Sequence, residues 1–153
     1  MTLSADLALA YLDRAFDQML ATLERVAEED LATPPFGAAT TSISGLVTHS
    51  TEVSRYWLGH VGLGDPSDRD RDAEFTHRAD RTELVDRIAQ ARAAATDHLT
   101  RLADGEGQAS EMRGFLYGDQ SDDSLVLHVV EELYQHLGHM EITADALAAR
   151  RAS

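Results

Sequence analysis

Residues 121–150, "SDDSLVLHVVEELYQHLGHMEITADALAAR", form the clearest helical pattern of the chain. Ser121 and the two aspartates after it are typical of a helix start. A serine oxygen caps free N–H groups there, and acidic side chains favour the positive end of the helix dipole. The apolar positions recur at helical spacing, as expected for a helix with one face in a core: Leu125, Val129, Leu133, Met140 and Leu147. We therefore predict a helix from Ser121 to about Arg150.

Three further helices are indicated upstream. The first runs from Ser4 to about Asp30, the second from Ser42 to the glycines at 62 and 64, and the third from Asp80 to just before Gly105. The expected core residues of the first helix are Leu7, Tyr11, Phe16, Leu20, Leu23 and Val26, and those of the third are Leu84, Ile88, Ala91, Ala95, Leu99 and Leu102.

The connecting segments are polar and rich in turn residues. They include "GDPSDRDRDAEF" at residues 64–75 and "GEGQAS" at residues 105–110, both of which we expect to be loops. Four long helices without strand-like alternation predict an all-α fold, a four-helix bundle formed by a single domain over residues 1–153. The connections are long enough for crossovers, so the order of the helices stays open.

Composition restricts the function. With 27 acidic and 13 basic residues, the chain has a net charge of −14, which argues against a basic face for nucleic acid. It has no Cys, so a metal site must use His and carboxylates. The N-terminus has no basic signal-peptide region, and no apolar run would span a membrane. We expect a cytoplasmic protein. All its basic residues are Arg, a bias typical of G+C-rich genomes.

Ionisable residues cluster on one side of the last helix. With His128 at zero on a helical wheel, His139 lies at about 20°, Glu132 at about 40° and His136 at about 80°. Glu132 and His136 are four residues apart, so both can point at one metal ion. His49 lies on the apolar face of the second helix and is the expected third ligand. Three protein ligands leave a coordination position open, which is typical of catalytic zinc.

The same residues also have simpler interpretations. His49 fits a hydrogen-bonded core histidine, and Glu132 with His136 fits a surface pair. Tyr56 and Trp57 are expected in the core, away from any substrate. The remaining histidines near helix ends or in a loop are expected to be solvated: His60, His77 and His98.

Two stretches resemble the DinB-like helical bundles. They are "TSISGLVTHSTEVSRYWLGHVGLGDPSDRDRDAEF" (41–75) and "LHVVEELYQHLGHMEI" (127–142), and the likeness is greatest to the branch that includes mycothiol-dependent maleylpyruvate isomerase. Many DinB-like proteins use a helix-two His and a His-x-x-x-His pair, whose first His is Glu in this branch. The resemblance thus implies His49, Glu132 and His136 as metal ligands. It also implies that His128, Glu131 and His139 surround the ligands or line a cleft.

The chain departs from that branch in three places. Asp123 and Ser124 stand where the branch often has Arg-Trp, and Ala144 stands where it often has Arg. These changes leave the expected ligands intact but remove partners for anionic groups of a thiol or substrate. The isomerase also has a further C-terminal domain, and this chain ends soon after its last helix, so we do not expect maleylpyruvate as the substrate.

The resemblance implies thiol chemistry at a metal. We expect a divalent metal, zinc or alternatively nickel, that binds mycothiol or a similar small thiol. The resulting thiolate would attack a small electrophile in a transferase or isomerase reaction, as in detoxification. Alternatives are a metal-hydroxide hydrolase, a non-catalytic metal-binding or stress-response bundle, and a helical dimer without metal. Pairing into a homodimer is a further expectation.

Overall fold

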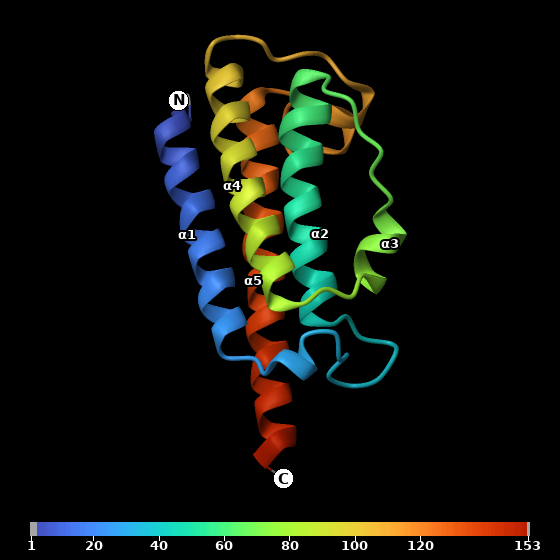
Figure 1. Ribbon diagram of the computed structural model, residues 1–153. Coiled ribbons are helices and arrows are strands. Elements are labelled where there is room, and N and C mark those ends of the chain that lie inside the picture. Colours follow the sequence, from blue (N-terminus) through green and yellow to red (C-terminus); the bar gives the residue numbers. More distant parts are fainter. Residues whose placement is uncertain (1–2, 153) are drawn as a thin grey trace.

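The structure, a computed structural model, describes residues 3–152. Its four long helices are α1 (Ala5–Glu24), α2 (Ile43–Arg55), α4 (Arg81–Ala103) and α5 (Asp122–Ala152), and a π-helical turn at Tyr56–Val61 continues α2. The short α3 (Arg71–Thr76) and two 3-10 segments, Glu28–Asp30 and Glu111–Phe115, complete the helices of the described residues. No strand occurs among them. The prediction of an all-α four-helix bundle is confirmed (Figure 1).

The helix directions explain the long connection between α2 and α4. Figure 1 shows α1 and α5 running in one direction and α2 and α4 in the other. Both α1 and α2 pack against α4 and α5, so α1 and α2 occupy diagonal corners. Because α2 and α4 are parallel, the chain between them must return along the outside of the bundle. We call residues 62–80 the crossover segment; it carries α3 and settles the order that the sequence left open.

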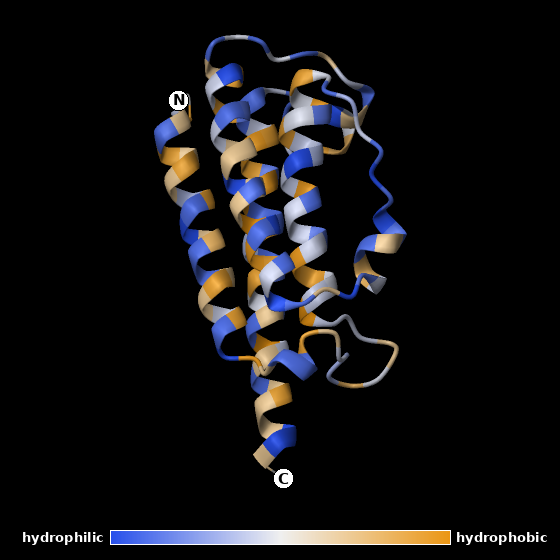
Figure 2. Cartoon of the chain, viewed as in Figure 1, coloured by the Kyte–Doolittle hydropathy of each residue, from blue (hydrophilic) through white to orange (hydrophobic). Residues whose placement is uncertain are grey.

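The helix starts, and the core positions of α4 and α5, agree with the predictions from the sequence. The side chains of Ser4, Ser42 and Asp80 accept hydrogen bonds from backbone N–H groups three residues later. All the core residues predicted for α4 and α5 are buried. Apolar residues recur along every long helix, as an amphipathic bundle requires (Figure 2). Within residues 3–152, no helix combines the length and apolar character needed to cross a bilayer.

The prediction for the first helix is wrong in two respects. α1 ends at Glu24, because the chain then turns to bury Val26 and Leu31 under the end of the core. Leu7 and Tyr11 are about half exposed, whereas the buried face also includes small residues that let neighbouring helices approach. The buried residues of α1 are Ala8, Leu12, Ala15, Phe16, Met19, Thr22 and Leu23.

The segment predicted as a loop at residues 64–75 contains α3. Asp70 caps this helix by accepting a hydrogen bond from the backbone N–H of Ala73, 3.1 Å away. Two residues of α3 pack inward: Glu74 is 4% exposed, and the Phe75 ring stacks on His49. Burial of these side chains against α2 favours a helical turn here in spite of the charged sequence.

Candidate metal centre

His49 lies in the middle of α2 and is buried, with 3% of its surface exposed. Its Nδ1 is 2.7 Å from Oε2 of Glu74 on α3. The Phe75 ring stacks on the imidazole with a centroid distance of 4.4 Å. The interpretation of His49 as a hydrogen-bonded core histidine is therefore correct for one ring nitrogen, while Nε2 is left for another partner.

Glu132 and His136 lie one turn apart on α5. Oε2 of Glu132 is 3.3 Å from Nε2 of His136, and both side chains are partly exposed. The hydrogen bond from His136 lowers the pKa of Glu132 below its usual value, and this effect outweighs the opposing effect of burial. Glu132 is thus held as a carboxylate, the form that binds a cation.

The fold brings these two residues to His49. The His49 and His136 rings are nearly perpendicular, with centroids 4.5 Å apart. One ligand atom from each of His49, Glu132 and His136 lies within 4.8 Å of the other two. Two atoms that each bind one zinc at about 2.1 Å are at most about 4.2 Å apart, so a small inward movement would suffice. Two imidazoles and a carboxylate suit zinc or a similar metal, so the donor set fits.

Glu74 is a hydrogen-bond partner of the candidate site that the sequence reasoning missed. Burial alone would raise its pKa, but hydrogen bonds from His49 and Arg69 outweigh burial and hold the pKa below its usual value. Arg69 donates from Nε to Oε1 at 2.6 Å and from a terminal nitrogen to Oε2 at 3.0 Å. The signal in the sequence was local: Asp70 as a helix cap, and Phe75 as an apolar residue in a charged segment.

The three clustered residues line a cleft of about 1210 Å³. The side chains that line the cleft are largely apolar. Two of the lining residues, Tyr56 and Trp57, come from the π-helical turn that continues α2, and π-helical turns are often found at functional sites. Tyr56 and Trp57 were expected in the core; Trp57 is 9% exposed, and both residues also line the cleft. The other apolar side chains of the cleft belong to Val53, Phe75, Met112, Phe115 and Ile142.

The remaining expected cleft residues are placed differently from one another. His128 and His139 line the cleft, and His128 packs edge-on against Trp57 at a centroid distance of 4.4 Å. Neither belongs to the three-residue cluster. Glu131 is not among the cleft residues; its side chain is 53% exposed, and Oε2 is 3.8 Å from Nδ1 of His128, too far for a hydrogen bond.

The prediction that His98 is solvated is wrong. Its side chain is 12% exposed, and a Cβ added at Gly59 would lie 2.8 Å from the His98 ring. Burial lowers the pKa of His98 below its usual value in spite of nearby Asp65. The sequence showed only that His98 is near a helix end; the glycine that makes room for it lies on another helix.

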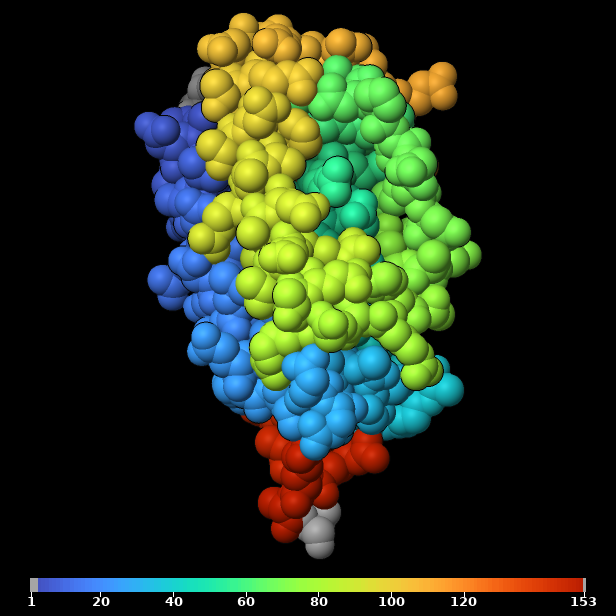
Figure 3. Space-filling model, viewed as in Figure 1, coloured from blue at the N-terminus to red at the C-terminus, as the bar shows by residue number. Residues whose placement is uncertain are grey.

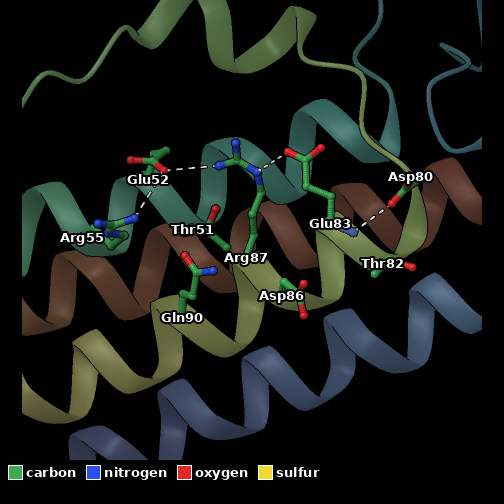
Figure 4. Close-up of a pocket in the computed structure, with 9 residues that line it drawn as sticks. All are labelled: Thr51, Glu52, Arg55, Asp80, Thr82, Glu83, Asp86, Arg87 and Gln90. Carbon is green, nitrogen blue, oxygen red and sulfur yellow. Dashed lines mark hydrogen bonds and ion pairs between the residues drawn. The ribbon is translucent and has the colours of Figure 1, made fainter.

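A second recess lies between α2 and α4, where Figure 3 shows α2 set back between α4 and the crossover segment. Figure 4 shows that Arg55 and Arg87 contact carboxylates of the groove, whereas no contact is drawn for Asp86. Arg87 lies 3.4 Å from a carboxylate oxygen of Glu52 and 3.0 Å from one of Glu83, and Arg55 also approaches Glu52. Both arginines of the groove are paired with carboxylates, and its lining contains no histidine, so the groove offers no ligand set like that of the cleft.

The chain matches the family model of Mycothiol-S-transferase over residues 7–148. Searches of curated proteins and of solved structures gave no match. The family match includes α2, α3 and most of α5, the helices that carry the cluster and its hydrogen-bond partners. Because the match covers most of the chain, the chain belongs to the Mycothiol-S-transferase family, a DinB-like family of helical bundles.

Proposed function

We propose that this protein is a metal-dependent transferase that joins the sulfur of mycothiol, or of a similar small thiol, to a small electrophile. The observation that carries the proposal is the convergence of His49, Glu132 and His136 beside a cleft, in a member of the Mycothiol-S-transferase family. Zinc is the metal that this donor set suits best, with nickel as an alternative. Removal of reactive electrophiles, as in detoxification, is the role we assign.

The three clustered residues would hold the metal. A bound divalent ion lowers the pKa of a thiol, so that the thiolate nucleophile is available at neutral pH. The chain has no Cys, so the reacting sulfur has to come from the small thiol. His128 and His139 line the same cleft and are available to accept the proton that the thiol loses.

The walls of the cleft would hold the electrophile. Trp57 and Phe75 present aromatic surface beside the cluster, and Phe115 is 73% exposed and lines the cleft. Such surfaces exclude water from the reacting atoms and favour an apolar or aromatic substrate body. Arg71 adds positive charge to the lining.

The test uses zinc-loaded protein, mycothiol and monobromobimane. In this reaction the S–C bond forms, the C–Br bond breaks, bromide leaves and the thiol proton goes to the medium. We expect fluorescent conjugate to form faster than without protein, and this acceleration to require both metal and thiol. His49→Ala should abolish it, while Glu52→Gln in the α2–α4 groove should retain it.

Two outcomes would contradict the proposal. Conjugation no faster than in the metal-free control, for a panel of thiols and electrophiles, would exclude transfer. Metal-dependent turnover of esters or amides without thiol would favour a hydrolase. Three further properties also stay predictions: a cytoplasmic location, a single domain and a homodimer.

A further inference from the structure

We propose that Arg69 and Glu74, which lie outside the four long helices, are positioning residues that hold the His49 ring in the orientation needed to bind a metal. This inference rests on the metal site of the proposed function and deepens it. It assigns a role to the crossover segment, which supplies neither a metal ligand nor any of the four long helices.

The hydrogen bonds fix which His49 nitrogen is free. Arg69 occupies both oxygens of Glu74 in a fork, a geometry that guanidinium forms with a carboxylate. An ionised carboxylate only accepts hydrogen bonds, so the 2.7 Å contact requires the proton of a neutral His49 on Nδ1. Nε2 then keeps its lone pair for the metal. Histidine ligands often have such a carboxylate partner, which sets their tautomer and orientation.

The same contacts exclude Glu74 as a metal ligand. Both of its oxygens are engaged by Arg69, and one also by His49. The Arg69 and Glu74 charges cancel, so the pair adds no net charge beside the metal. Arg69 is itself held, because its guanidinium lies 5.0 Å from the centre of the Tyr56 ring.

The crossover segment is anchored where it crosses α2. A Cβ at Gly45 would lie 2.7 Å from the Phe75 carbonyl oxygen, so this close approach requires glycine. The Ser44 hydroxyl donates to the His77 carbonyl oxygen at 2.9 Å and accepts from the Ala79 N–H at 2.9 Å. Phe75 covers the imidazole face while Glu74 holds its edge. Rotation of the His49 ring is thus restricted from two directions.

Glu74→Gln tests this role, with Glu83→Gln as the matched control. Glu83 also contacts a histidine, His77, at 2.8 Å, but these side chains are 34% (His77) and 45% (Glu83) exposed, unlike the buried pair of His49 and Glu74. We expect Glu74→Gln to weaken zinc binding roughly 10- to 100-fold in competition with a chelating dye. Glu83→Gln should bind zinc as the unchanged protein does.

The tautomer of His49 is the second readout and needs no metal. Long-range proton–nitrogen NMR of metal-free protein should show His49 protonated on Nδ1. Glu74→Gln should mix the two tautomers, and Glu83→Gln should not. A purely structural role of Glu74 would leave both tautomer and affinity unchanged in folded protein, and that result would overturn the inference.

A charge-balanced variant covers the case in which Glu74→Gln does not fold. Arg69→Gln with Glu74→Gln removes both charges of the pair together, and circular dichroism reports whether the helices remain. The double variant should lose the same 10- to 100-fold in zinc affinity. If the protein with its original sequence binds no zinc, the proposed metal site is contradicted. If both variants keep full zinc affinity, the positioning role alone is overturned.

Discussion

Two recesses border α2, and they differ in how their polar groups are satisfied. In the groove between α2 and α4, Arg87 lies between Glu52 and Glu83 (Figure 4), and all three side chains are partly exposed. In the cleft between α2 and α5, Glu132 faces His49 and His136 at the edge of the core. The groove thus pairs its arginines with carboxylates, while in the cleft two imidazoles and a carboxylate converge to within 4.8 Å of one another.

The difference shows why charge alone does not mark a site. Exposed ion pairs contribute little to stability and occur on many surfaces. Buried polar groups are costly unless they have partners. His136 Nδ1 is buried with no hydrogen-bond partner among the described residues, and His49 and Glu74 are almost fully buried. We therefore assign function to the cleft, and the following experiments test that contrast.

The largest expected effect is on bound metal. The triple variant of His49, Glu132 and His136 to Ala should lose the metal, from about one ion per chain to none, because no ligand remains. A triple Gln variant of Glu52, Glu83 and Asp86 in the groove should keep it. Elemental analysis after dialysis measures both, in protein purified without a histidine tag. Full occupancy in the first variant would refute the assignment.

The free energy of unfolding should fall more when the carboxylate behind His49 is removed than when a carboxylate of the groove is removed. Glu74→Ala leaves Arg69, whose side chain is 11% exposed, without its partner, and breaking a buried pair costs up to about 3–5 kcal/mol. Glu83→Ala removes exposed contacts and should cost no more than about 1 kcal/mol. Urea unfolding of metal-free protein gives both values. Equal losses would show that the two carboxylates do not differ in this way.

Two glycines beside the cleft should respond with opposite signs. Gly45→Ala forces a Cβ to within 2.7 Å of the Phe75 carbonyl oxygen, and overpacking of this kind costs about 1–3 kcal/mol. Gly138 on α5 has no atom near its added Cβ, so Gly138→Ala should stabilise the helix by up to about 1 kcal/mol. Thermal unfolding compares them. A stabilising Gly45→Ala would mean that the crossover segment does not press on α2.

Part of the acid dependence of stability should originate at Glu74, behind His49. Because the pKa of Glu74 in the folded protein is below its usual 4.5, its contribution is complete above that pH and is lost as the pH falls further. Metal-free protein should therefore unfold more easily below about pH 4.5, and Glu74→Gln should show a shallower dependence. Denaturant titrations at several pH values give the slopes. An unchanged slope in the variant would place the acid-sensitive groups elsewhere.

The smallest effect is expected at the other cleft histidines. His139→Ala and His128→Phe should retain about one metal per chain, because neither residue belongs to the ligand cluster. Phe keeps an aromatic ring at position 128 against Trp57. Metal content and zinc affinity provide the measurement. A loss of metal as large as that of His49→Ala would add the residue concerned to the ligands.

The sequence by itself determined the features that depend on neighbouring residues. Caps at Ser42 and Asp80 act over three residues, and the pairing of Glu132 with His136 follows from the helical repeat. Apolar periodicity likewise predicted the buried faces of α4 and α5. His49 could be proposed as the third metal ligand because it lies on an apolar face, where an ionisable side chain is costly unless it has a partner.

Only the tertiary structure decided what depends on distant residues. Glu74 meets His49 across 25 positions of sequence, and no local pattern encodes that contact. It exists because α2 and α4 are parallel, which sends the crossover segment back along α2, and because Gly45 allows its backbone to approach. Burial of His98 likewise depends on Gly59 in another helix. Helical periodicity fixes which side chains share a face, whereas packing between helices fixes which faces meet.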